Sequence, residues 1–268
     1  MTGRIKMAVC CAVLMALAST ASADNARKDD SGREISTPPA NWVFGSHTGD
    51  AFCDDFDSYT LGPVTPQTPE WEMWAGSVDV SGIVTTDQAF SPPHSLAIIG
   101  TPPGSTGLGD DTVHVNSPLI NGGVWVFSLM TYVPTGMTGH GWIILQNTYE
   151  PPYIPGNGLN WSLQVHLQGD GRVVADFDLE EIPLIFDQWV EFRAEIDLPN
   201  DSVDYFYDGV QFVFGKSWID GVGETGVSNI ASIDLYGGDA GAPGGPTTGV
   251  FYDDVKLFEV GGPGCGCG

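Results

Sequence analysis

Short segments rich in β-branched and aromatic residues follow one another along most of the chain. They are residues 124–133, 142–147, 161–167, 172–178, 189–197, 202–207, 210–214, 230–236 and 250–258. Gly, Pro, Asn or Asp usually separates them, and residues 169–171 and 208–209 are typical of hairpin turns. No helical periodicity is evident after Thr20. The pattern predicts an all-β fold, a two-sheet antiparallel sandwich or jelly roll.

Alternation within two segments assigns faces. In 189–197, apolar side chains alternate with Glu191, Arg193 and Glu195. In 161–167, Trp161 falls in phase with the apolar residues, and polar ones such as Gln164 and His166 fall out of phase. Because successive strand residues point to opposite faces, each segment is expected to have one dry and one wet face.

The N-terminus has the layout of a secretory signal peptide over residues 1–23. Arg4 and Lys6 precede an apolar run over 7–20, and Ala21-Ser22-Ala23 provides the small residues at a cleavage point. The run is too short for a membrane anchor, and no later stretch is long and apolar enough for one. We therefore expect a secreted or cell-surface protein without membrane insertion.

The remainder divides into a leader, a domain and a tail. Residues 24–49 are mostly polar and are predicted to be disordered, whereas 50–260 hold the strand pattern of a single domain. Residues 261–268 are rich in Gly and Cys, which predicts a flexible tail of the kind that joins a domain to a surface or to a further domain. In an exported chain, Cys53 is expected to pair with Cys265, or alternatively with Cys267.

The formal net charge of the chain is −25. Nucleic acids and anionic lipids need a basic surface, so neither is expected as a partner. The charge also disfavours a polyanionic glycan. Adaptation to salt and binding of calcium, a cation that prefers carboxylate oxygens, both remain as explanations of the acidity.

Four groups of residues resemble a known family. They are residues 52–59 with Leu61-Gly62 and Trp71, residues 91–98, residues 189–209 and residues 251–257. Their order is similar to that in bacterial concanavalin A-like, laminin-G-like domains, over about residues 52–258. The resemblance implies a jelly roll, a fold that hosts lectins, glycan-binding modules, glycosidases, lyases and adhesive domains.

The resemblance places the first and last strands of the domain side by side. Asp55 and Asp57 would then meet Asp253 and Asp254, and such crowding of carboxylates is unfavourable without a cation. We therefore predict a structural calcium ion at these four residues. The alternative is that these side chains point outward and are simply solvated.

Grooves in this fold bind glycans, which stack on aromatic rings and bond to amide and carboxylate groups. The alternative for tryptophans of a β-sandwich is burial in the core. The candidate carbohydrate-binding residues are Trp142, Gln146, Tyr149, Trp161, Gln164 and His166.

Signals for catalysis are weaker. Laminarinase- and lichenase-like enzymes of this fold carry a Glu-x-Asp-x-(x)-Glu motif, and the nearest match, from Asp176 through Asp178 to Glu181, begins with Asp instead of Glu. Gln164-Val-His166 is similar to the Gln-x-His pair of alginate lyases, but the matching Arg and Tyr strands are not evident. Asp176, Asp178, Glu181 and His166 are therefore weak catalytic candidates.

Three functions follow, in this order. The first is a secreted, non-catalytic carbohydrate-binding module, stabilised by calcium, with a neutral polysaccharide as its partner. The second is a polysaccharide hydrolase or lyase of the same fold. The third is a structural or adhesive surface protein.

Overall fold

The computed structural model describes residues 27–28, 34–35, 52–74, 80–100, 109–137, 139–149, 160–175, 180–221, 226–238 and 249–262. The chain divides into two units, Met1–Thr37 and Pro38–Gly268. In the first unit, β1 (Arg27–Lys28) pairs with β2 (Glu34–Ile35) in antiparallel fashion. These short strands belong to the segment that the sequence predicts to be a disordered leader. The predicted signal peptide lies outside the described residues.

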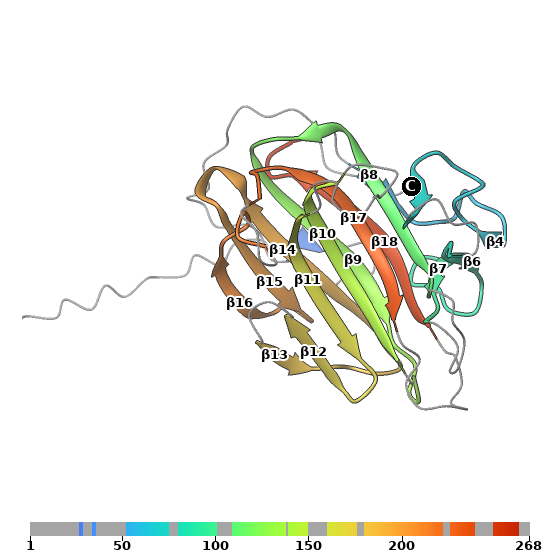
Figure 1. The fold of residues 1–268 in the computed structure, drawn as a ribbon. Helices are drawn as coiled ribbons and strands as arrows, with labels where there is room; N and C mark the ends of the chain where they lie inside the picture. The colour runs from blue at the N-terminus through green and yellow to red at the C-terminus, as the bar shows by residue number, and fades with distance from the viewer. Residues whose placement is uncertain are drawn as a thin grey trace, which may run out of the picture. The chain divides into compact units, whose positions relative to one another are not determined.

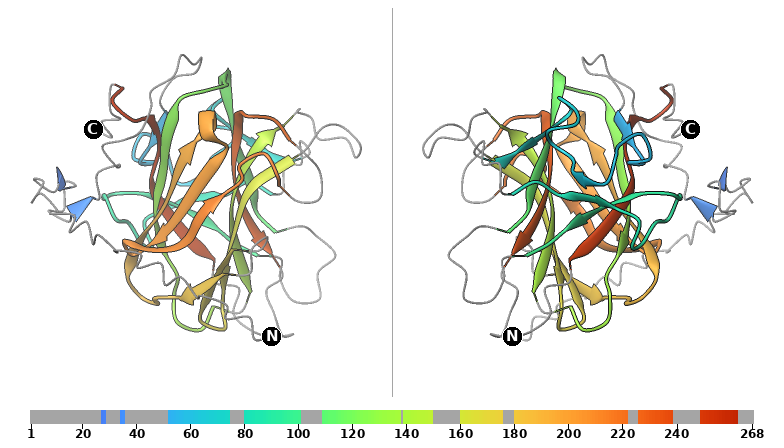
Figure 2. Two further views of the ribbon diagram at one scale, coloured as in Figure 1. Left: turned by 90° about the vertical axis from the view of Figure 1, so that its left-hand side faces the viewer. Right: turned by 90° about the vertical axis from the view of Figure 1, so that its right-hand side faces the viewer.

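The second unit consists of two antiparallel sheets (Figures 1 and 2). The seven-stranded sheet has the order β13 (Glu181–Pro183), β12 (Arg172–Ala175), β11 (Asn160–Gln168), β10 (His140–Thr148), β17 (Ile230–Gly238), β8 (Asp111–Ile120) and β5 (Trp71–Met73). The nine-stranded sheet has the order β16 (Val210–Lys216), β15 (Ser202–Tyr207), β14 (Trp189–Asp197), β9 (Val124–Tyr132), β18 (Val250–Glu259), β7 (Ser95–Ile98), β6 (Ile83–Thr85) and β4 (Gly62–Pro63), with β3 (Phe52–Asp54) also paired to β18. A short 3₁₀ turn, Leu198–Asn200, links β14 to β15.

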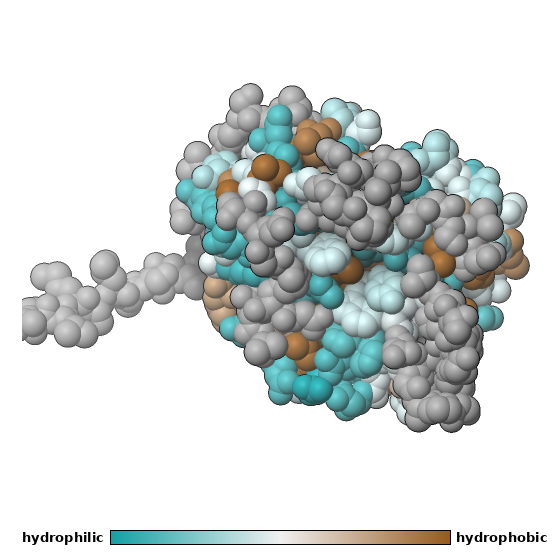
Figure 3. Space-filling model, in the orientation of Figure 1, coloured by the Kyte–Doolittle hydropathy of each residue, from teal (hydrophilic) through white to brown (hydrophobic). Residues whose placement is uncertain are grey.

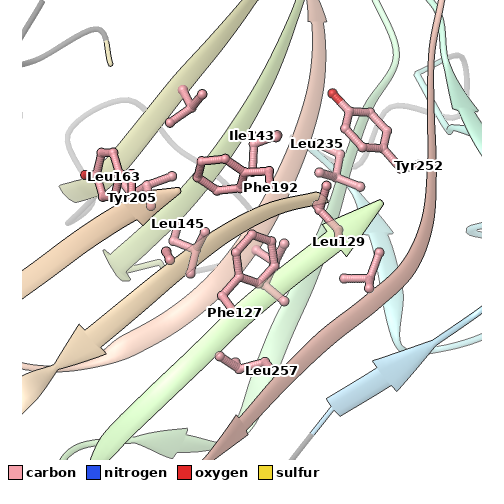
Figure 4. Packing of buried hydrophobic residues seen from close by; sticks show 14 of the residues in the cluster. Phe127, Leu129, Ile143, Leu145, Leu163, Phe192, Tyr205, Leu235, Tyr252 and Leu257 are labelled. Carbon is pink, nitrogen blue, oxygen red and sulfur yellow. The ribbon is translucent and has the colours of Figure 1, made fainter. Parts of the chain in front are cut away.

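Side chains from both sheets fill one core between them (Figure 4). Ile143 and Leu145 of β10 meet Phe127 of β9 and Phe192 of β14 in this cluster, and all four are fully buried or nearly so. Burial of apolar side chains of this size stabilises the fold by about 1.5–3 kcal/mol each. The predicted all-β, two-sheet jelly roll is therefore confirmed, as is the dry face of residues 189–197. The predicted wet face of that segment is wrong, because Arg193 and Glu195 are buried.

The first and last strands of the domain are neighbours, as the sequence predicts. In the antiparallel register of β3 and β18, Asp54 lies opposite Val255 and Cys53 lies opposite Lys256. Cys53 is disulfide-bonded. Its predicted partners, Cys265 and Cys267, lie outside the described residues, so the pairing stays a prediction.

The surface of the described residues shows few large hydrophobic side chains. Leu61, Leu119, Val210, Phe214 and Val227 are the exposed ones. No helix in the described part of the chain is long and apolar enough to cross a membrane. On the side that Figure 3 shows, hydrophobic residues are scattered among hydrophilic ones. These exposed hydrophobic residues come from separate segments of the chain.

Candidate functional site

A row of aromatic side chains crosses the outer face of the seven-stranded sheet, away from the core. In the register of the sheet, Trp142 of β10 lies opposite His166 of β11 on one side and Tyr236 of β17 on the other. Their neighbours along each strand, such as Ile143 and Leu235, point into the core. We call His166, Trp142 and Tyr236 the ring row.

The three rings are stacked on one another. The centroid of the Trp142 ring is 4.3 Å from that of His166 with an interplanar angle of 12°, and 5.1 Å from that of Tyr236 with an angle of 26°. Because the two neighbours come from opposite flanking strands, they cover both faces of the indole. All three side chains are half-buried, so a ligand meets the edge of Trp142 and not its flat face.

The indole of Trp142 also lies close against the end of β17. A Cβ atom at Gly238 would come within 1.8 Å of the Trp142 ring. Only glycine leaves room for this approach. The sequence pattern Tyr-Gly-Gly at the end of β17 is therefore part of what positions the ring row.

Polar groups without partners lie on the same face. Gln146 is fully buried; its Oε1 accepts a hydrogen bond from Ser232 Oγ, and its Nε2 has no partner among the described residues. Trp161 lies opposite Gln146 because the register shifts between Leu145 and Gln146, and its buried Nε1 also has no partner in the described part of the chain. Simple alternation, which puts Trp161 in phase with core residues, is wrong here because of this irregularity.

Two carboxyl groups meet beside the ring row. Asp111 of β8 lies opposite Tyr236, and Asp234 lies two residues before Tyr236 on β17. The side chains of Asp111 and Asp234 are hydrogen-bonded to each other and are only 7% and 3% exposed. Burial raises the pKa of Asp111 to about 7, and burial together with the Asp111 charge raises the pKa of Asp234 well above its usual range. Both shifts favour a protonated carboxyl in the pair at neutral pH.

Tyr149, a predicted binding residue, extends this polar region. Its hydroxyl donates to Glu72 Oε1 over 2.6 Å, and its ring lies 5.6 Å from that of Trp74. Burial and this hydrogen bond raise its pKa. Gln164, another predicted residue, is half-buried and lies opposite Ile144 on β10. The described strands thus carry all six candidate carbohydrate-binding residues on or beside one sheet.

The two catalytic candidates that the structure describes, Glu181 and His166, are not brought together. Glu181 is exposed on β13, where Arg172 NH1 lies 3.1 Å from its Oε2. Val174 of β12 lies between Glu181 and His166, so the two are separated by two strand spacings, roughly 10 Å. Asp176 and Asp178 lie outside the described residues.

The predicted calcium ligands converge on one segment, but through hydrogen bonds. Asp57 Oδ1 accepts from His94 N, and Asp253 Oδ2 accepts from the N–H groups of Phe90 and Ser91. Asp254 Oδ1 accepts from Ser91 Oγ, while its Oδ2 accepts from Lys256 Nζ over 2.9 Å.

Asp55 Oδ1, the fourth predicted ligand, accepts from the N–H of Asp57. A cation would have to replace these donors, and no group of three or more His, Cys, Asp or Glu residues is arranged for a metal in the described ranges. As they are placed, these residues do not fit a calcium ion, and calcium stays a prediction of the sequence.

Comparison with known proteins gives the fold. No family model and no curated protein matches the chain. The solved structure of alginate lyase Aly36B aligns over 78% of this chain and 97% of its own, with 9% identity and a TM-score of 0.52. Alginate lyase vAL-1 from Chlorella virus aligns over 75% and 98%, with 14% identity and a TM-score of 0.48.

A sialidase aligns over 80% of this chain with 11% identity and a TM-score of 0.49, but the chain spans only 18% of its length. At identities this low, the comparisons bear on architecture and not on activity. The alignment with alginate lyase Aly36B and the two antiparallel sheets around one core show that this chain has the two-sheet jelly-roll fold that the sequence predicts.

Proposed function

We propose that the domain is a non-catalytic module that binds a neutral polysaccharide across the outer face of the seven-stranded sheet. The ring row is the observation that carries the proposal. Its three half-buried rings span neighbouring strands and present aromatic edges beside amide and carboxyl groups. Sugars have both apolar C–H surfaces and hydroxyl groups, and such mixed surfaces suit both.

Unsatisfied polar atoms on this face support the proposal. A buried donor without an acceptor costs about 1–3 kcal/mol, a cost that an incoming hydroxyl oxygen removes. Gln146 Nε2 and Trp161 Nε1 are such donors among the described residues. The charge of −25 supports a neutral glycan over an anionic one.

Two further expectations from the sequence belong to the proposal. The signal segment over residues 1–23 supports a role outside the cell. Calcium, if it binds near Asp57 and Asp253, would stabilise the fold without taking part in recognition of the glycan.

The proposal is tested by measuring binding of the full chain to a panel of neutral and anionic polysaccharides. We expect retention by a neutral polysaccharide, a loss of about tenfold or more in affinity for Trp142→Ala, and a smaller loss for Gln164→Ala. Trp189→Ala is the matched control, because Trp189 is a half-buried ring on the outer face of the nine-stranded sheet.

Three outcomes would contradict the proposal. Binding that the control weakens as much as Trp142→Ala would place the ligand elsewhere. Silence across the neutral panel would exclude the proposed partner. Release of reducing ends or unsaturated sugars by the unmodified chain would instead favour an enzyme.

A further inference from the structure

The Asp111–Asp234 pair is a second organised feature of the same face. Asp111 Oδ1 and Asp234 Oδ1 are both buried, and neither has a hydrogen-bond donor among the described side chains or backbone groups. Yet the two carboxyl groups are hydrogen-bonded to each other. Two buried carboxyl groups in this arrangement need a proton between them, because two like charges at such a distance repel strongly.

Gln146 is an independent sign that this region awaits a ligand. Ser232 and Asp234 are alternate residues of β17 and share its outer face. Since Ser232 donates to Gln146 Oε1, the Gln146 amide lies against β17 at Ser232, two residues before Asp234, which lies opposite Ile144. Its Nε2 is fully buried and has no acceptor in the described part of the chain.

The titratable groups around the pair are almost all acids. The neighbours that bear on the charge of Asp111 or Asp234, or lie beside them, are Glu72 of β5, Asp110 of β8, Tyr149 after β10, Tyr236 of β17 and Tyr252 of β18. From β10, His140 stands at the end of the strand opposite Gly238, and His166 lies on the other side of Trp142 from Tyr236. Loss of the shared proton would thus add negative charge to a region that is already acidic.

We propose that the Asp111–Asp234 pair positions Tyr236 in the ring row through one shared proton, and that loss of this proton weakens glycan binding. Asp111 lies directly opposite Tyr236, so separation of the two carboxylates moves the neighbour that flanks the tyrosine. The inference rests on the proposed function, and Asp111 and Asp234 act in it as positioning residues.

The energetic setting agrees with this geometry. Burial raises the pKa of Asp111 to about 7, and burial together with the charge of Asp111 raises the pKa of Asp234 well above its usual range. An amide at position 234 keeps the donor to Asp111 but has no proton to lose.

The first experiment compares polysaccharide affinity from pH 6 up to the highest pH at which the chain stays folded, in the unmodified chain and in Asp234→Asn. We expect the affinity of the unmodified chain to fall by about tenfold as the pair ionises, and that of Asp234→Asn to stay constant within about twofold. Asp110→Asn is the matched control, because burial raises the pKa of Asp110 to about 6 although its carboxylate bonds to the N–H of Ile99. Asp111→Asn replaces Asp234→Asn if the latter does not fold.

An equal fall in Asp234→Asn, or a profile that Asp110→Asn flattens as much, would overturn the inference. A measurement of Trp142 fluorescence in the absence of glycan tests the positioning role separately from the proposed function. The fluorescence of Trp142 is obtained by subtracting the spectrum of Trp142→Phe, and we expect it to change with pH in the unmodified chain but not in Asp234→Asn. If no polysaccharide binds at any pH, the proposed function fails; if the Trp142 signal is independent of pH, the positioning role fails.

Discussion

The two outer faces of the sandwich bury charged groups in opposite ways. On the nine-stranded sheet, Arg193 is 2% exposed; its NH2 lies 3.1 Å from Glu195 Oε1, and its guanidinium lies 4.2 Å from the centre of the Phe206 ring. On the seven-stranded sheet, Asp111 and Asp234 bury like charges together. The first arrangement is neutralised within the fold, whereas the second depends on a proton from outside.

The aromatic clusters of the two faces also differ in how their rings pack. Tyr132, Trp189 and Phe251 on the nine-stranded sheet pack edge-on or tilted, with centroid distances of 5.5 and 6.1 Å. Trp142, by contrast, is stacked nearly parallel to both of its neighbours. Unpaired buried polar atoms occur on both faces, since Arg193 Nε and NH2 also lack a hydrogen-bond partner among the described residues, so the stacking of the rings is what distinguishes the two faces.

The largest effect on stability is expected from removal of the buried Arg193–Glu195 ion pair on the nine-stranded sheet. Arg193→Met leaves Glu195 buried without its cation, and we expect a loss of about 3 kcal/mol in the free energy of unfolding. Urea denaturation measures it. Arg172→Met is the control, because Arg172 forms its ion pairs with Asp170 and Glu181 at the exposed surface. Exposed ion pairs contribute less than about 1 kcal/mol. Equal losses of unfolding free energy in the two variants would show that the buried Arg193–Glu195 pair stabilises the fold no more than an exposed pair.

The pH dependence of stability tests the like-charge pair. The folded pKa values of Asp111 and Asp234 are raised above the unfolded value of about 3.9, so their contribution is full below that pH and is lost as pH rises through about 7 and above. We therefore expect the unfolding free energy of the unmodified chain, relative to Asp234→Asn, to decrease from pH 5 to pH 8. A difference that is constant over this range would show that the two carboxyls do not share a proton in the fold.

A smaller effect is expected at Gly238, where the atoms nearest to an added Cβ belong to Trp142. Gly238→Ala puts a methyl group where the Trp142 ring lies, so the ring must move. We expect about a tenfold loss of polysaccharide affinity, equivalent to about 1.4 kcal/mol. In the double variant Gly238→Ala with Trp142→Ala, affinity should equal that of Trp142→Ala alone, and additive losses would refute the contact.

The smallest effect is expected from calcium. The carboxylates of Asp57, Asp253 and Asp254 already accept N–H, O–H and ammonium donors, so an added cation has little left to neutralise. We expect excess calcium, compared with a chelator, to raise stability by less than about 1 kcal/mol, measured as a shift in melting temperature. A large shift would mean that this region, like the Asp111–Asp234 pair, needs a charge from outside; no shift would exclude the predicted ion.

Much of the fold can be predicted from the sequence, because apolar and other residues alternate regularly along many of its strands. The bounds of β14 and β15 coincide with the predicted segments, and the neighbouring of β3 and β18 follows from the resemblance. β8 is not predicted, since Pro118 and Asn116 interrupt its apolar pattern. Asp111, on β8, could not be linked to Asp234, because their contact depends on which strands pair.

The candidate site was predictable only residue by residue. Alternation puts Gln164 and His166 on one face of their strand, and the structure places His166 opposite Trp142. The stacking that covers both faces of Trp142 depends on Tyr236, whose strand lies far along the sequence. The one local signal for Asp234 is a charged residue amid the apolar side chains of β17.

The antiparallel pairing of β3 with β18 has a mechanical consequence. Phe52, where β3 begins, lies opposite Leu257, near the end of β18, so the chain enters and leaves the domain at the same point. Tension on both ends would peel this pair apart one hydrogen bond at a time instead of shearing it, with the disulfide of Cys53 close to the point of load. A domain whose ends leave together can also be spliced into a surface loop of another protein without separating the flanking chain.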